Sequence, residues 1–451
     1  MTTIFAEQAL LFNGWAGNVR LEIEDGRIVA IQKDRQPQPD DERHAIIAPG
    51  MPNLHSHAFQ RGMAGLAETR GPGADSFWSW REVMYRFALS MTPEQVEAVA
   101  AQLYVEMLEA GFTRVGEFHY LHHDKDGSPY ANLAEMAERI AAASSQTGIA
   151  LTLLPVFYAH SGFGGAVPND GQRRFINDVD RFGKLLEKAQ EAVSGLNRGI
   201  VGVAPHSLRA ATPDELTAVV PLAAGGPVHI HIAEQVKEVE DCIAWSGTRP
   251  VEWLLANQPV NEHWCLIHAT HMTDAETTGM AKSGAVAGLC PITEANLGDG
   301  TFNAPLFIEH GGAFGVGSDS NVLIGLADEL RQLEYSQRLF HRGRNVLAAP
   351  GQSNGRNLFD RAVYGGNQAL GVTAAGLAKG AAADFVSLDA ASPSLIGKAG
   401  DAILDAWIFA SGTGVDCVWV GGRKVVERGR HTARDRVAKG FSKAMMELSS
   451  A

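Results

Sequence analysis

Eight short apolar segments, spaced through the middle of the chain, constrain its fold more than any other feature of the sequence. Stretches with helical periodicity lie between them, as at 93–110 and 213–222. Strands that alternate with helices form parallel sheets, and eight such units close a (β/α)8 barrel. The sequence therefore predicts an α/β protein whose residues 49–370 form a TIM-like barrel. The expected strands are 45–54, 113–118, 150–157, 200–205, 227–232, 264–268, 285–290 and 313–318.

Both ends of the chain show strand patterns of a different kind. Residues 21–31 alternate apolar and polar side chains around Asp25-Gly26, which is typical of a hairpin turn. Residues 384–389 predict another strand, and residues 418–426 a second hairpin that turns at Gly421-Gly422. We expect residues 1–48 and 371–451 to meet in one small β-sandwich domain, with a helix at the end of the second segment.

Composition limits the size of the core and the range of partners. The 451 residues are 45% hydrophobic and 20% charged, which suffices for a large barrel and a smaller unit. The net charge of −13 argues against a nucleic-acid partner. The N-terminus lacks the pattern of a secretory signal, and no apolar run is long enough to cross a bilayer. We expect a cytoplasmic protein whose four cysteines, without a Cys-x-x-Cys pair, are reduced.

Histidines and a carboxylate stand where the predicted strands end, which is where TIM-barrel enzymes carry their catalytic groups. His55 and His57 lie two residues apart after the first strand, so both rings face the same side. His231 on the fifth strand and Asp319 after the eighth complete a set of three neutral nitrogens and one carboxylate, which suits Zn²⁺ or Fe²⁺. We predict one divalent metal at these four residues, with zinc preferred. His229 shares a strand face with His231, which is preferred because it lies nearer the strand end.

Two further residues near these strand ends can take part in proton transfer. Glu234 lies three residues after His231, within reach of a water whose pKa a metal would lower to roughly 7. His268, at the end of the sixth strand, can hydrogen-bond the attacking hydroxide or the charge that develops on a substrate. His271 competes with His268 for this role, and Asp319 has the alternative role of a helix cap. Structural or solvent-exposed roles are expected for the other histidines near strand ends, which are His119, His122, His123 and His160.

As a set, these motifs resemble the amidohydrolase superfamily over essentially the whole chain. The set comprises His-x-His on the first strand, His-x-x-Glu on the fifth, His on the sixth and Ser-Asp on the eighth. The resemblance implies a metal-dependent barrel with a β-sandwich built from both termini. Binuclear members carry a bridging carboxylated lysine on the fourth strand, whereas residues 200–206 contain no lysine here. A single metal ion is therefore implied.

Cationic and hydrogen-bonding side chains follow several of the predicted strands, near the expected mouth of the barrel. Guanidinium groups bind carboxylates through two parallel hydrogen bonds, so two or more arginines at a mouth favour an anionic substrate such as a dicarboxylate. A purine or pyrimidine pocket would need no such cations. The residues concerned are Gln60, Arg61, Arg81, Tyr120, His206 and Arg209.

Three segments resemble the formimidoylglutamate deiminases of histidine degradation, namely 52–61, 204–210 and 229–235. The likeness implies that a dicarboxylate amidine, N-formimidoyl-L-glutamate, is hydrolysed to N-formyl-L-glutamate and ammonia, and it suggests a homodimer. By this likeness Glu234 protonates the amidine nitrogen, His268 helps to hold the tetrahedral intermediate, and Asp319 relays the second proton. Arg81 and Arg209 would meet the two carboxylates, within a substrate-binding set of Gln60, Arg81, Tyr120, His206 and Arg209.

The sequence leaves other functions open. A different mononuclear aminohydrolase would act on a formimidoyl-aspartate, a guanine-like base or a chlorinated triazine, and of these only a carboxylate-bearing substrate would use Arg81 and Arg209. Imidazolonepropionate hydrolysis would open a ring amide without releasing ammonia. A catalytically inactive scaffold would be expected to lack metal ligands, and none is missing here. Residues 71–80 mix hinge residues with aromatics and form either a lid or an ordered loop.

Overall fold

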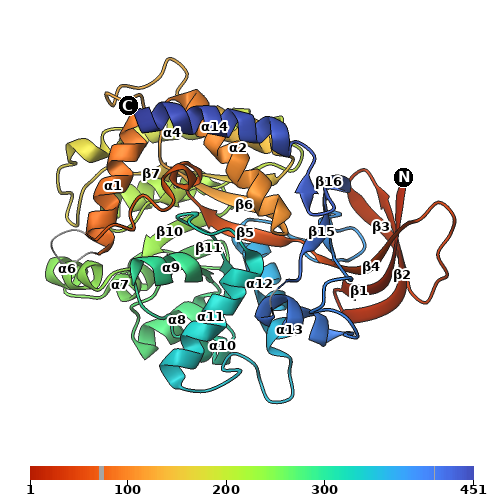
Figure 1. Cartoon of the computed structure of the whole chain (residues 1–451). Coiled ribbons are helices and arrows are strands. Elements are labelled where there is room, and N and C mark those ends of the chain that lie inside the picture. Colours follow the sequence, from red (N-terminus) through yellow and green to blue (C-terminus); the bar gives the residue numbers. More distant parts are fainter. Residues whose placement is uncertain (71–75, 411, 451) are drawn as a thin grey trace.

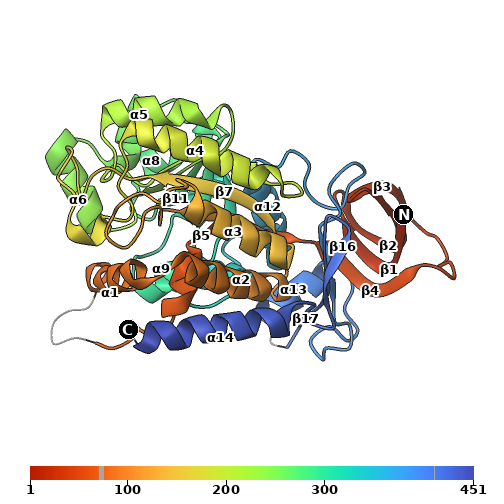
Figure 2. The same ribbon diagram turned by 90° about the horizontal axis from the view of Figure 1, so that it is seen from above.

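The structure is a computed structural model that describes residues 1–70, 76–410 and 412–450. A barrel of strands surrounded by helices takes up most of the molecule, and a smaller β unit lies at one side (Figure 1). The first strands of the chain and the last ones stand together in that unit, as both views show (Figures 1 and 2). No helix within the described residues combines the length and apolar character that a membrane span requires.

The barrel is built from two parallel sheets whose edges join. One sheet has the order β5-β6-β7-β8, with β9 also paired to β7, and the other has the order β10-β11-β12-β13. Bridges at Val203–Val228, Ser207–His231 and Ser56–Asp319 connect the two sheets, so the barrel closes. The predicted fold class is confirmed. The strands are β5 (Met51–Ser56), β6 (Phe112–His119), β7 (Ala150–Phe157), β8 (Ile200–Val201), β9 (Ala204–Pro205), β10 (Val228–Ile232), β11 (Trp264–His268), β12 (Val286–Leu289) and β13 (Ala313–Val316).

The predicted first strand, 45–54, is wrong as a single element. Its first half belongs to β4 (Glu42–Pro49), which pairs with β1 (Thr2–Leu11) and β14 (Phe385–Leu388) of the smaller unit. Its second half is β5 of the barrel. Gly50 lies at the crossing between the two. A Cβ on Gly50 would come within 2.2 Å of the Thr113 side chain, so only glycine lets the chain pass so close to β6.

The predicted fourth strand, 200–205, is also interrupted. It divides into β8 and β9 at Gly202, whose N–H donates to the Leu153 carbonyl at 2.9 Å. A Cβ on Gly202 would lie 2.5 Å from the Pro227 carbonyl oxygen, so the backbones of neighbouring strands approach closely there.

Helices cover the outside of the barrel, and their caps explain where several begin. Thr92 and Gln95 form a capping box at the start of α2, which confirms the helix expected at 93–110. The helix expected at 213–222 is shorter than predicted, because a 3₁₀ turn follows from Val220. The helices are α1 (Phe77–Ser90), α2 (Pro93–Glu109), α3 (Glu135–Thr147), α4 (Val179–Ser194), α5 (Pro213–Val219), α6 (Val236–Ser246), α7 (Pro250–Asn257), α8 (Asp274–Ser283), α9 (Pro291–Leu297), α10 (Ala304–Glu309), α11 (Leu326–His341) and α12 (Asn354–Ala369).

The smaller unit is an eight-stranded sheet from both ends of the chain, in the order β17-β16-β15-β14-β4-β1-β2-β3. Both predicted hairpin turns are present, and Asp25 and Gly26 adopt positive φ angles of 48° and 77°. Apolar side chains from both ends, including Ile47 and Trp419, pack in its own core. The remaining elements are β1 (Thr2–Leu11), β2 (Gly14–Glu24), β3 (Arg27–Gln32), β14 (Phe385–Leu388), α13 (Asp401–Phe409), β15 (Val415–Val420), β16 (Arg423–Glu427), β17 (Arg430–His431) and α14 (Arg434–Ser450).

The last helix, α14, leaves the smaller unit and lies along α2 of the barrel (Figure 2). The Gln95 amide donates to the Glu447 carboxylate at 3.1 Å across this contact. The C-terminal segment therefore touches both parts of the molecule.

Candidate metal centre and cleft

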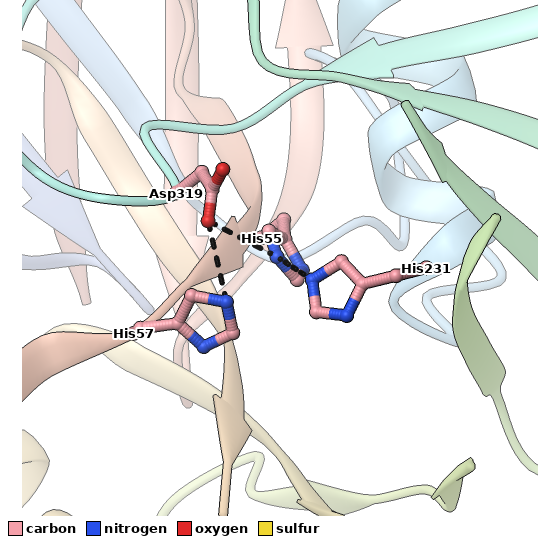
Figure 3. A group of neighbouring side chains, drawn as sticks. All are labelled: His55, His57, His231 and Asp319. Carbon is pink, nitrogen blue, oxygen red and sulfur yellow. Dashed lines mark hydrogen bonds and ion pairs between the residues drawn. The ribbon is translucent and has the colours of Figure 1, made fainter. Parts of the chain in front are cut away.

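The four predicted metal ligands meet at the carboxyl ends of the barrel strands. The Nε2 atoms of His55 and His231 are 3.0 Å apart. Oδ1 of Asp319 lies 3.4 Å from Nε2 of His55 and 3.2 Å from Nε2 of His57. Figure 3 shows the three rings and the carboxylate pointing toward one another. All four residues are buried, with at most 5% of their surface exposed.

The backbone at the barrel seam fixes Asp319 between the two histidines of β5. The Asp319 N–H donates to the His55 carbonyl at 3.0 Å, and the His57 N–H donates to the Asp319 carbonyl at 3.1 Å. Asp319 adopts φ +44° and His268 φ +67°, a region that residues with a Cβ rarely enter. Such strain persists where surrounding contacts enforce it, and it is concentrated at functional sites. No helix begins at Asp319, since α11 starts at Leu326 with Gly325 as its N-cap, so the alternative role as a helix cap is excluded.

Main-chain hydrogen bonds at Nδ1 of His57 and His231 direct the Nε2 atoms of these two rings into the cluster. Nδ1 of His57 bonds the Phe118 carbonyl at 2.9 Å, and Nδ1 of His231 bonds the His206 carbonyl at 3.1 Å. A carbonyl can only accept, so Nδ1 carries the proton and Nε2 is free to bind a metal. Burial lowers the pKa of His55 to about 3, so this imidazole is neutral at ordinary pH. Three imidazole nitrogens and one carboxylate fit a single divalent cation.

Glu234 and His268 lie beside this cluster. Oε1 of Glu234 is 3.8 Å from Nε2 of His268, which lies 3.7 Å from Oδ2 of Asp319. Burial raises the pKa of Glu234 above its usual value. Burial opposes a charge on His268, but Glu234, Glu294 and Asp319 together raise its pKa to about 10. Nδ1 of His268 lies 3.3 Å from the Glu294 carboxylate, which orients the ring. The arrangement places a protonated imidazole and a basic carboxylate next to the four ligands.

A cleft opens above the cluster. His57, His231, Glu234, His268 and Asp319 form its floor. All members of the substrate-binding set predicted from the sequence line its walls, which are Gln60, Arg81, Tyr120, His206 and Arg209.

Two guanidinium groups face this cleft from different elements. Arg81 lies on α1, and its guanidinium stacks 4.5 Å from the ring centre of Trp78. Arg209 follows β9 and is 9% exposed, with Nη2 4.0 Å from Glu234 and 3.9 Å from Glu238. Burial would lower the pKa of Arg209, but Glu238 and Glu234 raise it, so the guanidinium stays charged.

Glu238 is a buried residue that sequence reasoning missed. Its carboxylate accepts the backbone N–H of Ala233 and of Glu234, each at 3.2 Å, and faces Arg209. Glu238 therefore connects Arg209 in the cleft with the backbone of Glu234, whose own carboxylate lies next to the metal ligands. Its position in the first turn of α6 carried no signal, because a glutamate in a helix is usually solvent-exposed.

The competing histidines are engaged elsewhere. Nε2 of His229 bonds the Ala369 carbonyl at 2.7 Å, away from the cluster, and Nε2 of His271 bonds the Asp299 carbonyl at 2.8 Å. His122 and His123 bond main-chain carbonyls in the same way. Arg61, near the mouth in sequence, instead forms an ion pair with Glu106 at 2.8 Å.

Several apolar and aromatic residues of the cleft were also missed from the sequence. Tyr158 directly follows β7, so the position after a strand end could have marked it. The others come from α1, the loop before α4 and the end of α9, which only the tertiary structure brings to the mouth. They are Phe77, Trp80, Met84, Tyr85, Phe175 and Leu297. Residues 71–80, expected to form either a lid or an ordered loop, lie partly outside the described residues. Within this segment, Ser76 caps α1, which carries Arg81.

A (β/α)8 barrel that carries three histidines and an aspartate at its strand ends is typical of a metal-dependent hydrolase. Comparisons with known proteins indicate the same class. The chain belongs to the amidohydrolase family, whose sequence profile matches residues 46–425. Members of this family use a divalent metal. Residues 1–45 match the profile described as formimidoylglutamate deiminase HutF, N-terminal domain. The predicted resemblance is thereby confirmed.

Individual relatives extend this result. The chain is 52% identical over 454 residues to the formimidoylglutamate deiminase of Pseudomonas aeruginosa, covering 99% of this chain and all of the relative. A solved amidohydrolase structure from Brucella melitensis matches with a TM-score of 0.98 and 66% identity over both full chains. An adenosine deaminase structure from Xanthomonas campestris with bound zinc matches with a TM-score of 0.82 at 20% identity, covering 100% of this chain and 99% of that one, and shows the fold alone.

Proposed function

We propose that this protein is a metal-dependent deiminase that hydrolyses N-formimidoyl-L-glutamate to N-formyl-L-glutamate and ammonia. The observation that carries the proposal is that Arg81 and Arg209 line the same cleft as the four-ligand cluster and Glu234. Two guanidinium groups can pair with the two carboxylates of a dicarboxylate, while the amidine carbon reaches the carboxylate and imidazole at the cleft floor. The 52% identity to a formimidoylglutamate deiminase supports the same reaction.

The residues that would hold the metal are His55, His57, His231 and Asp319, and we propose zinc as the ion. When bound there, a divalent cation lowers the pKa of a water to roughly 7 and so supplies hydroxide at neutral pH. The absence of lysine from 200–206 supports one ion rather than two. Elemental analysis of the purified protein tests both the identity and the number of the ions.

Glu234 and His268 would move the protons of the reaction. Glu234 takes a proton from the attacking water as the C–O bond forms, and passes it to the terminal imino nitrogen. Burial raises the pKa of Glu234, which makes it a stronger base for this transfer. His268 donates Nε2–H to the oxygen that gains charge. Asp319 relays the second proton from that oxygen to the same nitrogen, so the C–N bond breaks and ammonia leaves.

The remaining predicted residues would bind the glutamate part. Arg81 and Arg209 pair with the two carboxylates, while Gln60, Tyr120 and His206 orient the formimidoyl group. Gln60 already donates to the Tyr120 hydroxyl at 2.9 Å, which holds the two side chains together. We also propose that the enzyme acts in histidine degradation, in the cytoplasm and as a homodimer. Sedimentation of the purified protein tests whether it is a homodimer.

The first experiment is ammonia release by the zinc-loaded protein from N-formimidoyl-L-glutamate, with N-formimidoyl-L-aspartate and guanine alongside. We expect rapid release from the glutamate compound only. Arg209→Gln should lose most of this activity, whereas Arg173→Gln, a surface arginine paired with Asp170, should keep it. Release from guanine but not from the glutamate compound would overturn the roles given to the arginines.

A further inference from the structure

Three side chains outside the cleft bring metal-binding atoms together in the smaller β unit. They are His44 of β4 and the adjacent residues Asp416 and Cys417 of β15. Oδ2 of Asp416 lies 3.8 Å from Nδ1 of His44 and 3.4 Å from Sγ of Cys417. One nitrogen, one oxygen and one sulfur thus lie within 4.8 Å of one another. The separations of 3.4 and 3.8 Å are comparable to those between neighbouring ligands of a tetrahedral ion.

A β-bulge explains how two adjacent residues of a strand can share a site. Side chains of successive residues normally point to opposite faces of a sheet. Here Ser387 pairs with Cys417 while Leu388 pairs with Val415, so Asp416 is an extra residue on β15. A bulge of this kind re-aims side chains, and it turns the Asp416 carboxylate toward the Cys417 thiol.

Neighbouring residues orient these atoms as outer partners orient metal ligands. Nε2 of His44 lies 3.0 Å from the Glu42 carboxylate, which holds the proton on Nε2 and leaves the Nδ1 lone pair facing Asp416. Lys424 pairs with Glu42 at 2.5 Å and neutralises it. Ser387 donates its hydroxyl to Oδ2 of Asp416 at 3.2 Å.

Exposure differs along the cluster in a way that suits the entry of an ion. Cys417 is buried, and the His44 side chain is 9% exposed, next to the Trp419 ring at 4.9 Å between centroids. The Asp416 side chain is 33% exposed and gives access from solvent. A water can then complete a fourth position.

We propose that His44, Asp416 and Cys417 form a second cation site, separate from the cleft, for zinc or another divalent ion that binds thiolates. On binding, the Cys417 thiol gives its proton to solvent, and the thiolate and the carboxylate together balance the two charges of the ion. The ion connects β4 to β15, which are separated in the sheet by β14. It therefore acts as a clamp between the N-terminal and C-terminal halves of the β unit.

Cobalt titration of the metal-free protein tests this proposal independently of the deiminase activity. A thiolate bound to Co²⁺ absorbs in the near ultraviolet, whereas the ligand set in the cleft contains only nitrogen and oxygen. We expect the wild type to bind two Co²⁺ ions and to show the thiolate band. Cys417→Ser and the partly exposed Asp416→Asn variant should each bind one ion and lose or strongly reduce the band.

Cys290→Ser is the matched control, because Cys290 lies within 4.8 Å of ligand atoms of His268 and Asp319 in the cleft. This variant should keep the thiolate band. A band that is lost in Cys290→Ser but kept in Cys417→Ser would overturn the proposal. So would a wild type that binds a single ion without a thiolate band. The Asp416→Asn variant decides the outcome if Cys417→Ser does not fold.

Discussion

Glu238 offers a sharp test of how the cleft holds Arg209. Its carboxylate is fully buried and lies 3.9 Å from Nη2 of Arg209. At that distance two unit charges attract by about 4 kcal/mol at an effective dielectric constant of about 20. Desolvation offsets part of this attraction, and Glu234 at 4.0 Å shares the cation. We therefore expect a coupling of about 2 kcal/mol between Glu238 and Arg209, which corresponds to roughly a 30-fold effect on kcat/KM.

The assay is a double-mutant cycle with Glu238→Gln, Arg209→Gln and the double variant, all metal-replete. Glutamine removes the charge and keeps the size of glutamate, but its NH2 group replaces one of the two oxygens that accept the backbone N–H groups of Ala233 and Glu234. This lost hydrogen bond is common to both backgrounds, so the cycle cancels it and isolates the coupling to Arg209. We expect Glu238→Gln to lower kcat/KM about 30-fold more in the wild-type background than in Arg209→Gln. Most of the loss should appear in KM, because a less firmly held Arg209 binds the substrate carboxylate more weakly.

The control for this cycle is Glu276→Gln. Glu276 is also a buried carboxylate, but it pairs with Arg249 at 2.6 Å away from the cleft. Glu276→Gln should change kcat/KM by the same factor in the wild-type and Arg209→Gln backgrounds. Equal losses for Glu238→Gln in both backgrounds would refute the reasoning that Glu238 acts through Arg209.

Three further predictions concern the general base, the metal and the pH dependence of stability. Glu234→Gln should keep its metal but lose turnover by about 10²- to 10⁴-fold, which steady-state assays and elemental analysis measure together. Chelation should abolish ammonia release and lower Tm, and added zinc should restore both, because an ion that binds only the folded state stabilises it. Burial lowers the pKa of His229 to about 4, while an unfolded histidine titrates near about 6.5. The unfolded state therefore binds more protons at this residue between these values, and the contribution of His229 to stability should fall by about 3 kcal/mol as pH decreases from 6.5 to 4. Urea unfolding of metal-free protein should show that the wild type loses about 3 kcal/mol more over this range than His229→Gln, which keeps a donor for the Ala369 carbonyl.

Each of these expectations has an outcome that would contradict it. Retained turnover in metal-replete Glu234→Gln would remove this residue from the proton transfer. Unchanged activity in protein shown to be metal-free would argue against the role of the four ligands. Parallel stability profiles for His229→Gln and the wild type would mean that His229 does not titrate differently in the two states.

The fold and the centre of the site were predictable because both depend on regular spacing. Apolar runs separated by helical stretches predicted the barrel, and residues at the ends of those runs predicted the cluster of His55, His57, His231 and Asp319. Strand ends in a barrel lie at one face whatever the details of the loops. The prediction of a single strand at 45–54 was wrong, because an apolar run does not indicate which sheet each of its halves pairs with. The domain boundaries remain predictions.

By itself the sequence determined the type of fold, the family motifs and the choice of His231 over His229, since these depend on residue type and order along the chain. The tertiary structure decided which side chains share a space. It brought α1, with Trp80 and Tyr85, to the mouth of the cleft, and it placed Glu238 beside Arg209. It also set His44 next to Asp416, although the two residues lie near opposite ends of the chain. Contacts of this kind depend on how helices and loops pack on the barrel, and packing distances between distant segments are not encoded in any local pattern.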